Sequence, residues 1–347
     1  MSKKFCVFAL VFVLLIAGAA SAALAAGRAV WSFNTDALIT GNIAVAGDLI
    51  LAGDASGKFY AVNKNTGRLA WSYYGKNSIV GTPAVSGNSV VISQADGTIT
   101  CLNLNNGNVI WLKEADIEGV GLTVVDGAAI GDGKAYIARG DGVLYALSLA
   151  NGQTVWTYKT ESYELRTAPS FSDNYVLLGE QNGKFDMIDP KTGKRVTGGG
   201  AGGAVNTPVV SNGDIYFSSW DGSVQRVQIK GVTPKWNSKV GDPITTKPVV
   251  AGGRVFVGTA NGLVFALSVE NGNILWRYDA GDGSIEATPV FADSALYIVT
   301  GQGTLTALDA QTGRERAAFG EYSSTSTPAY ENGTLFIASG ASINALR

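Results

Sequence analysis

The chain of 347 residues contains no histidine and few charged side chains, which make up 16% of it. The absence of histidine excludes a Ser-His-Asp triad, a histidine general base and the usual zinc sites. The formal net charge of -2 offers no basic surface for nucleic acid. Paired carboxylates could still act, although six of the 28 acidic residues stand in Asp-Gly pairs, where the turn itself explains them. We therefore predict no catalytic residue, no metal ligand and no nucleic-acid partner.

The N-terminal segment is typical of a secretory signal peptide. Lys3 and Lys4 precede a continuous apolar run over residues 5–20, and two Ala-x-Ala patterns follow it. We predict that residues 1–25 are a signal peptide and that residues 26–347 form one exported domain, periplasmic or extracellular. A retained membrane anchor is the alternative, because the run approaches the length of about 18 residues that spans a bilayer.

Cysteine is scarce, and its positions argue against a lipid anchor and an intramolecular disulfide, two features common in exported proteins. Cys6 lies inside the apolar run, and Ala26 and Gly27 follow the small residues, so no lipid anchor is expected. Only Cys101 remains after cleavage, which excludes an intramolecular disulfide. An exported domain without disulfides depends on a large core, and we expect Cys101 to be a small buried member of it.

What the chain has is a repeat of about 40 residues, marked by tryptophan. The six repeated tryptophans are Trp31, Trp71, Trp111, Trp156, Trp236 and Trp276. Four of them end a Gly-x-x-x-Trp segment, at 67–71, 107–111, 152–156 and 272–276. About thirty residues earlier in each repeat, a Thr-Pro or similar pair opens a strand, as at 82–83, 168–169, 207–208, 247–248, 288–289 and 327–328. A period of this length indicates a repeat architecture.

Each repeat contains the signals of four antiparallel strands. An Asp-Gly or Asn-Gly turn, which suits a two-residue hairpin, precedes an alternating strand at 141–147 and at 261–267. Four strands per 40 residues is typical of a propeller blade. We predict an all-β protein, an eight-bladed β-propeller of four-stranded antiparallel blades. An open β-solenoid is the alternative.

The two ends of the sequence favour a closed ring. Residues 345–347 end a third strand, whereas residues 27–31 have the pattern of a fourth strand. We therefore predict that the N-terminal strand completes the last blade, and we expect a monomeric propeller.

The pattern Thr-Pro…Gly-x-x-Tyr-Ala-Leu…Gly-x-x-x-Trp resembles the repeats of the pyrroloquinoline-quinone (PQQ) family of propellers over residues 27–347. The resemblance implies that each blade docks on its neighbour through its repeated tryptophan. The dehydrogenases of this family hold PQQ in the central funnel, typically with an adjacent cysteine pair and a calcium ion. This chain has no adjacent cysteine pair, so we expect no cofactor. A small enzyme with PQQ and calcium is the alternative.

The outer-membrane-protein assembly factors called BamB are a second branch that the chain resembles. They are propellers of similar size without an active site, and they bind a β-barrel assembly protein. Their contact includes a Leu-Arg pair before Ala-Pro, which residues 165–169 resemble, whereas their second, acidic contact is not matched near Gly203 and Val205. The resemblance implies a non-catalytic scaffold that binds a protein in the cell envelope.

Four residues are candidates for partner binding: Leu165, Arg166, Tyr163 and Trp220. Arg166 is the only basic residue at its position in the eight repeats, and arginine is favoured at interfaces; a solvated or internally ion-paired arginine is the alternative. Leu165 stands where most repeats are apolar, so plain core is its alternative. Tyr163 precedes this pair.

Trp220 is the one tryptophan outside the repeat position, and it stands just before an Asp-Gly turn. An aromatic side chain on a turn can anchor a partner, or it can pack on the neighbouring blade. The same repeat is irregular, because Arg226 replaces the usual alanine. The glycine-rich segment 198–203 is followed by a strand rather than a helix, so we interpret it as a connector and not a phosphate loop.

Overall fold

The computed structural model describes residues 28–114, 124–162, 165, 167–231, 233–281, 283–322 and 326–347. These residues form thirty-two β-strands and no helix, so none of them belongs to a helix long and apolar enough to cross a membrane. The predicted signal peptide, residues 1–25, lies outside the described residues.

The strands form eight groups of four, which are the blades. Blade 1 contains β2 (Ala44–Ala46), β3 (Leu49–Gly53), β4 (Lys58–Asn63) and β5 (Leu69–Tyr74). Blade 2 contains β6 (Ile79–Ser86), β7 (Ser89–Gln94), β8 (Ile99–Asn103) and β9 (Val109–Lys113). Blade 3 contains β10 (Val124–Gly131), β11 (Lys134–Arg139), β12 (Val143–Ser148) and β13 (Thr154–Lys159). Blade 4 contains β14 (Ser170–Ser172), β15 (Tyr175–Gly179), β16 (Lys184–Ile188) and β17 (Arg195–Gly200).

The second half of the chain repeats the arrangement. Blade 5 contains β18 (Val209–Ser211), β19 (Asp214–Ser218), β20 (Ser223–Gln228) and β21 (Thr233–Lys239). Blade 6 contains β22 (Val249–Ala251), β23 (Arg254–Gly258), β24 (Leu263–Ser268) and β25 (Ile274–Asp279). Blade 7 contains β26 (Val290–Ala292), β27 (Ala295–Val299), β28 (Thr304–Asp309) and β29 (Glu315–Glu321). Blade 8 contains β30 (Ala329–Glu331), β31 (Thr334–Ser339), β32 (Ser342–Leu346) and β1 (Ala29–Asn34).

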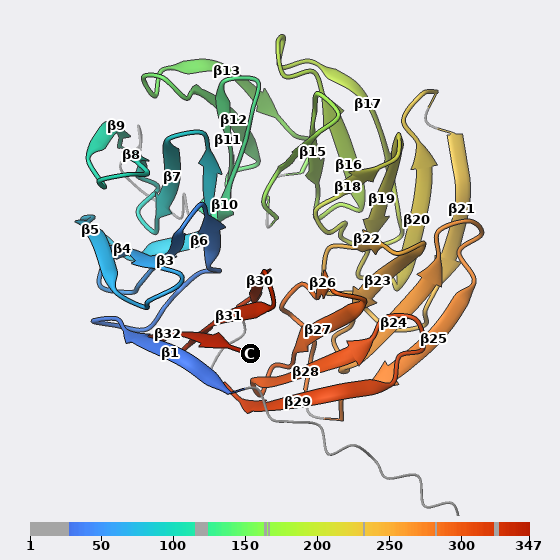
Figure 1. Ribbon diagram of the computed structural model, residues 1–347. Coiled ribbons are helices and arrows are strands. Elements are labelled where there is room, and N and C mark those ends of the chain that lie inside the picture. The colour runs from blue at the N-terminus through green and yellow to red at the C-terminus, as the bar shows by residue number, and fades with distance from the viewer. Residues whose placement is uncertain are drawn as a thin grey trace, which may run out of the picture.

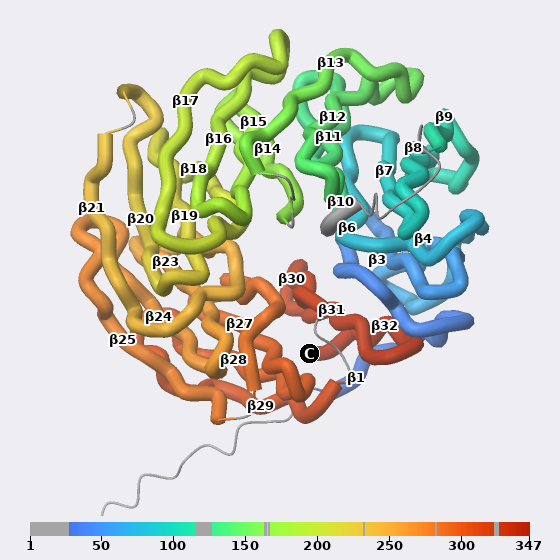
Figure 2. Tube along the Cα trace, turned by 180° about the vertical axis from the view of Figure 1, so that it is seen from behind, coloured from blue at the N-terminus to red at the C-terminus, as the bar shows by residue number. Residues whose placement is uncertain are grey.

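The blades stand around a central opening, with the first strand of each blade innermost (Figure 1). Figure 2 shows the same ring from behind. The antiparallel four-stranded blades confirm the predicted fold class over the solenoid alternative. One feature was not predicted: β6 and β10 share a parallel bridge between Thr82 and Gly127, which joins blades 2 and 3 into one eight-stranded sheet. A Cβ at Gly127 would lie 2.5 Å from the Thr82 carbonyl oxygen, so only glycine permits this approach.

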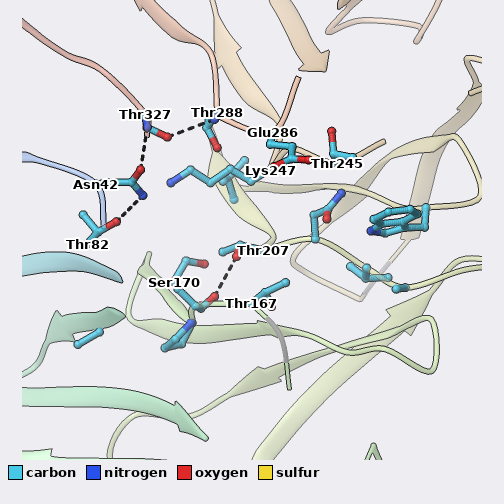
Figure 3. Close-up of a pocket in the computed structure, with 18 of the residues that line it drawn as sticks. Asn42, Thr82, Thr167, Ser170, Thr207, Thr245, Lys247, Glu286, Thr288 and Thr327 are labelled. Atoms are coloured by element: carbon cyan, nitrogen blue, oxygen red, sulfur yellow. Dashed lines mark hydrogen bonds between the residues drawn. The ribbon is translucent and has the colours of Figure 1, made fainter. Parts of the chain in front are cut away.

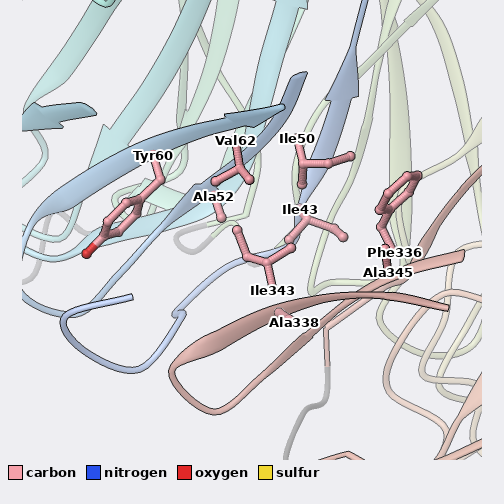
Figure 4. Packing of buried hydrophobic residues seen from close by; sticks show 9 residues of the cluster. All are labelled: Ile43, Ile50, Ala52, Tyr60, Val62, Phe336, Ala338, Ile343 and Ala345. Atoms are coloured by element: carbon pink, nitrogen blue, oxygen red, sulfur yellow. The ribbon is translucent and has the colours of Figure 1, made fainter. Parts of the chain in front are cut away.

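The N-terminal strand β1 completes the last blade, as the sequence predicts. It pairs antiparallel with β32, so that Trp31 faces Ala345 and Phe33 faces Ile343. Blade 8 then packs on blade 1 through a buried cluster (Figure 4). Its members are Phe336, Ala338, Ile343 and Ala345 from blade 8 with Ile43, Ile50, Ala52, Tyr60 and Val62 from the blade 1 side. Burial of this apolar surface joins the two ends of the chain.

The repeated tryptophans connect neighbouring blades by hydrogen bonds. The indole Nε1 of Trp71 in blade 1 donates to the Leu104 carbonyl oxygen of blade 2 at 2.8 Å. The equivalent bonds run from Trp31 to Lys64, Trp111 to Leu149, Trp156 to Pro190, Trp236 to Val269 and Trp276 to Ala310. Each acceptor lies between the third and fourth strands of the following blade. Blades 4 and 7 carry Thr197 and Ala317 instead of tryptophan at this register.

Cys101 lies fully buried in the cluster between blades 2 and 3 and is not in a disulfide. Burial raises the pKa of its thiol. It therefore fills space in the core, as the sequence predicts.

Candidate binding site in the central cavity

A cavity of about 550 Å³ occupies the centre of the ring. The starts of the innermost strands line it, so it is built from the residues of the Thr-Pro position and their neighbours in the blades. Its labelled polar residues are Asn42, Thr82, Thr167, Ser170, Thr207, Thr245, Lys247, Glu286, Thr288 and Thr327 (Figure 3). Hydroxyl and amide groups therefore dominate the wall.

Much of this polar wall joins neighbouring blades. Asn42 donates from Nδ2 to the Thr82 hydroxyl at 2.8 Å, and its Oδ1 accepts from the Thr327 amide at 2.7 Å. The Thr288 amide donates to the Thr327 hydroxyl at 3.2 Å. Thr207 donates to the Ala168 carbonyl oxygen at 2.9 Å. The Thr-Pro position therefore has a structural role. Its repetition is visible in the sequence, but its hydrogen-bond partners lie in other blades and become neighbours only in the folded ring.

Among the described residues, two charged side chains face this cavity, Lys247 and Glu286, and both are exposed. Lys247 occupies the Thr-Pro position of blade 6. Glu286 accepts a hydrogen bond from the Ser284 hydroxyl at 3.0 Å. No ion pair joins the two among the described residues, and Figure 3 shows the lysine side chain extended away from Glu286, toward Asn42. Sequence reasoning missed this pair, although a lysine among threonines at a repeated position was a usable signal.

Trp220 lies at the rim of the cavity and is 51% exposed. It stands in the turn between β19 and β20, and its amide donates to the Ala204 carbonyl oxygen at 3.0 Å, in the segment that connects blades 4 and 5. We call this side of the ring the connector face: it carries the blade-to-blade connections and the turns between the second and third strands. Leu38, in the connection from blade 8 to blade 1, is 62% exposed on the same face. The connector face therefore presents large apolar side chains to solvent.

The other three partner-binding candidates are Leu165, Tyr163 and Arg166. Leu165 is 0% exposed and packs among Tyr136, Leu144 and Leu178 between blades 3 and 4. The structure corrects the assignment of Leu165 as a partner contact, because a fully buried side chain cannot reach a partner. Leu165 belongs to the core, which was the alternative interpretation. Tyr163 and Arg166 lie outside the described residues. The described residues on either side of them, Ser162 and Thr167, follow β13 and precede β14.

A pair of buried carboxyl groups lies beneath the connection from β13 to β14, and sequence reasoning did not find it. Glu180 is 1% exposed and Asp186 2% exposed. The Ser162 amide donates to Glu180 Oε2 at 3.0 Å, and the Asn182 amide group donates to the same oxygen at 3.1 Å. Burial, and next the nearby Asp186, raise the pKa of Glu180 to about 7. Glu180 thus fixes the backbone directly before residue 163.

Asp186 differs from Glu180 because it has a cationic partner. Arg195 Nε contacts Asp186 Oδ1 at 2.5 Å, and the Tyr158 hydroxyl donates to Asp186 Oδ2 at 2.6 Å. Burial and the hydrogen bond to Asp186 raise the pKa of Tyr158. Both carboxyl groups are too deeply buried to meet a substrate, so this cluster is structural.

The irregular fifth blade has a structural explanation. Arg226, which replaces the usual alanine, pairs with the buried Asp214 at 2.5 Å and donates to the Val269 carbonyl oxygen of blade 6 at 2.6 Å. Val269 also accepts the Trp236 bond. Arg226 therefore adds a second connection between blades 5 and 6.

The described residues do not fit PQQ held with calcium. Calcium takes six to eight oxygen ligands, with carboxylates prominent among them, whereas Glu286 is the only carboxylate among the described lining residues. No group of three or more histidine, cysteine, aspartate or glutamate residues gathers in the described ranges. We therefore derive no chemistry through this cofactor.

Comparison with known proteins gives a family and a fold. The family model described as outer membrane protein assembly factor BamB matches residues 18–230, 161–278 and 221–344. BamB of Yersinia pestis is 30% identical over 129 residues, which cover 33% of this chain and 33% of that protein. A polyvinylalcohol dehydrogenase from a Pseudomonas species is 28% identical over 167 residues, which cover 45% of this chain and 25% of that protein.

The crystal structure of BamB from Moraxella catarrhalis matches with a TM-score of 0.78 at 21% identity, over 92% of this chain and 99% of that chain. At this identity the likeness shows the fold. In sequence, the chain spans about a third of the length of the first curated relatives it matches.

Proposed function

Because the chain belongs to the family of the outer membrane protein assembly factor BamB, we propose that it is a non-catalytic scaffold that binds a protein of the β-barrel assembly apparatus in the cell envelope. The predicted signal peptide, residues 1–25, supports an exported chain, periplasmic or extracellular. The proposal needs no cofactor and no lipid anchor.

The observation that carries the proposal is the exposure of Trp220 at the rim of the cavity. Tryptophan is enriched among the residues that carry most of the binding energy of protein interfaces. It lies in blade 5, next to the connection from blade 4. The residues at 163–166, with Arg166, precede blade 4. We propose that Trp220, Arg166 and Tyr163 form one partner-binding surface on the connector face.

The experiment is a pull-down of the barrel-assembly protein encoded in the same genome with wild type, Trp220→Ala and Tyr74→Ala. Tyr74 is 66% exposed at the end of β5 in blade 1 and serves as the matched exposed aromatic. We expect Trp220→Ala to weaken binding at least tenfold, as loss of an anchor worth about 1.4 kcal/mol or more does. Tyr74→Ala should bind as wild type does. Equal binding by all three proteins would contradict the site.

The enzyme alternative has its own measurement. A ligand that binds only the folded state raises the melting temperature. We expect no change on adding PQQ with calcium at saturating concentration. A clear rise would favour a quinoprotein instead of a scaffold.

A further inference from the structure

The Thr-Pro position is threonine in four blades, at residues 82, 207, 288 and 327. Asn42 occupies the same position in blade 1. Thr82, Asn42 and Thr327 join blades to one another through their side chains. A residue at this position therefore normally satisfies its polar group within the wall.

Lys247 departs from this rule. Its ammonium group has no hydrogen-bond or ion-pair partner among the residues that the structure describes, and its side chain extends into the cavity (Figure 3). An ammonium group carries three donors and no acceptor. Blade 6 therefore carries a cation that faces open space where other blades carry a hydroxyl that joins two blades. Packing of the blades does not explain a lysine at this position.

The wall near Lys247 offers further donors. The hydroxyl oxygens of Thr82 and Thr327 already accept hydrogen bonds, from Asn42 and from the Thr288 amide. A hydroxyl that accepts still has its own proton to donate, and neither of these donates to another described residue. Figure 3 shows Lys247 on the side of the cavity that carries Asn42, Thr288 and Thr327. A cation with nearby hydroxyl donors matches an oxyanion.

The charged side chains that line the cavity favour one kind of oxyanion over another. Lys247 is the only cation among the described lining residues, and Glu286 lies in the same cavity. A single positive charge with a carboxylate nearby favours one negative charge over two, which favours a carboxylate over a phosphate. Glu286 can accept from an amide N–H or an ammonium group of the same ligand.

We propose that the central cavity binds a carboxylate group through Lys247, assisted by the hydroxyls of Thr82 and Thr327. The carboxylate belongs to a free small acid or to the carboxyl terminus of a peptide chain. Trp220 lies at the rim of the same cavity, but the carboxylate site rests on Lys247 and does not depend on the partner-binding surface proposed around Trp220.

The experiment is calorimetric titration of the full chain at low salt with acetyl-trialanine and with its C-terminal amide. These probes differ only in the carboxylate. We expect the acid to bind wild type at least tenfold more tightly than the amide. Acetate is the third probe: displacement of the peptide by acetate at similar affinity identifies a free acid, and failure to displace identifies a chain terminus. Both results support recognition of the carboxylate.

Lys247→Thr is the decisive variant, because it restores the residue that four other blades carry and should leave the melting temperature unchanged or raised. It should abolish the preference for the acid. Lys76→Thr, which removes an exposed lysine outside the cavity, should keep it. Equal affinity for acid and amide in wild type, no binding of either, or an undiminished preference in Lys247→Thr would overturn the proposal.

Discussion

Gly107 of blade 2 packs so closely on the indole ring of Trp71 in blade 1 that a Cβ on the glycine would lie 2.5 Å from the ring. The same turn supplies the Leu104 carbonyl oxygen that accepts the Trp71 hydrogen bond. The glycine and tryptophan of the repeated Gly-x-x-x-Trp segment are therefore partners across blades, not within one blade. The pair recurs at Gly67, Gly152, Gly193, Gly272 and Gly313, each against the tryptophan of the preceding blade.

Gly107→Ala should destabilise the chain through this contact. Gly107 has a φ of +73°, which already disfavours a side chain, and the added methyl group would displace the indole ring. We expect a loss of about 2 to 4 kcal/mol in the free energy of unfolding, measured by denaturant titration.

Gly87→Ala is the matched control. Gly87 has a φ of +54°, but a Cβ there would meet nothing within 4 Å. It should lose only the backbone cost, about 1 kcal/mol. If the two variants lost the same stability, the indole contact would contribute nothing.

Glu180 should make stability depend on pH. Its pKa is raised from 4.5 to about 7 in the folded chain, so folding favours the protonated form. This contribution is fully present below pH 4.5 and is lost as the pH rises through 7. Glu180→Gln keeps a neutral group whose oxygen can accept from Ser162 and Asn182. It should match wild type at pH 4 and be more stable at pH 8, by about 1 to 3 kcal/mol.

Glu161→Gln serves as the control for that measurement. Glu161 is exposed and pairs with Lys184 near the same connection. Its substitution should leave the pH dependence of the melting temperature unchanged. A wild-type profile that stays parallel to that of Glu180→Gln from pH 4 to 8 would show that Glu180 is not protonated on folding.

Removal of β1 should weaken the ring. A chain starting at residue 35 loses the strand that pairs with β32, together with Trp31 and Phe33, which pack against the cluster between blades 8 and 1. The exposed β32 edge and the lost apolar contacts should lower the melting temperature clearly. A chain starting at residue 28 should melt as the parent does. Identical melting of both shortened chains would contradict closure by β1.

Arg166 stays a prediction from the sequence, and a charge reversal tests it. Arg166→Glu should reduce recovery of the barrel-assembly partner at least tenfold, because a like or unpaired charge at an interface costs more than a lost contact. Arg68→Glu reverses an exposed arginine on the opposite side of the ring and should not change recovery. Equal recovery with both variants would remove Arg166 from the surface.

The sequence predicted what repeats along the chain. The period, the Asp-Gly turns and the unmatched strand at residues 27–31 were enough for eight blades and for the pairing of β1 with β32. Contacts between repeats were harder, since they depend on which blades become neighbours. Glu180 and Asp186 belong to one blade, but nothing in their spacing shows that both are buried. Leu165 was assigned to a partner by resemblance, although the apolar residues at its position in other blades indicated the core.

Photocrosslinking tests the scaffold account most directly. A photoreactive residue would replace Trp220 or, as control, Leu275, which is 48% exposed on the outer strand β25. In the native cell envelope, position 220 should give an adduct with a β-barrel assembly protein, identified by mass spectrometry, and position 275 should not. Adducts with that protein from position 275 but not from position 220 would contradict binding through the connector face.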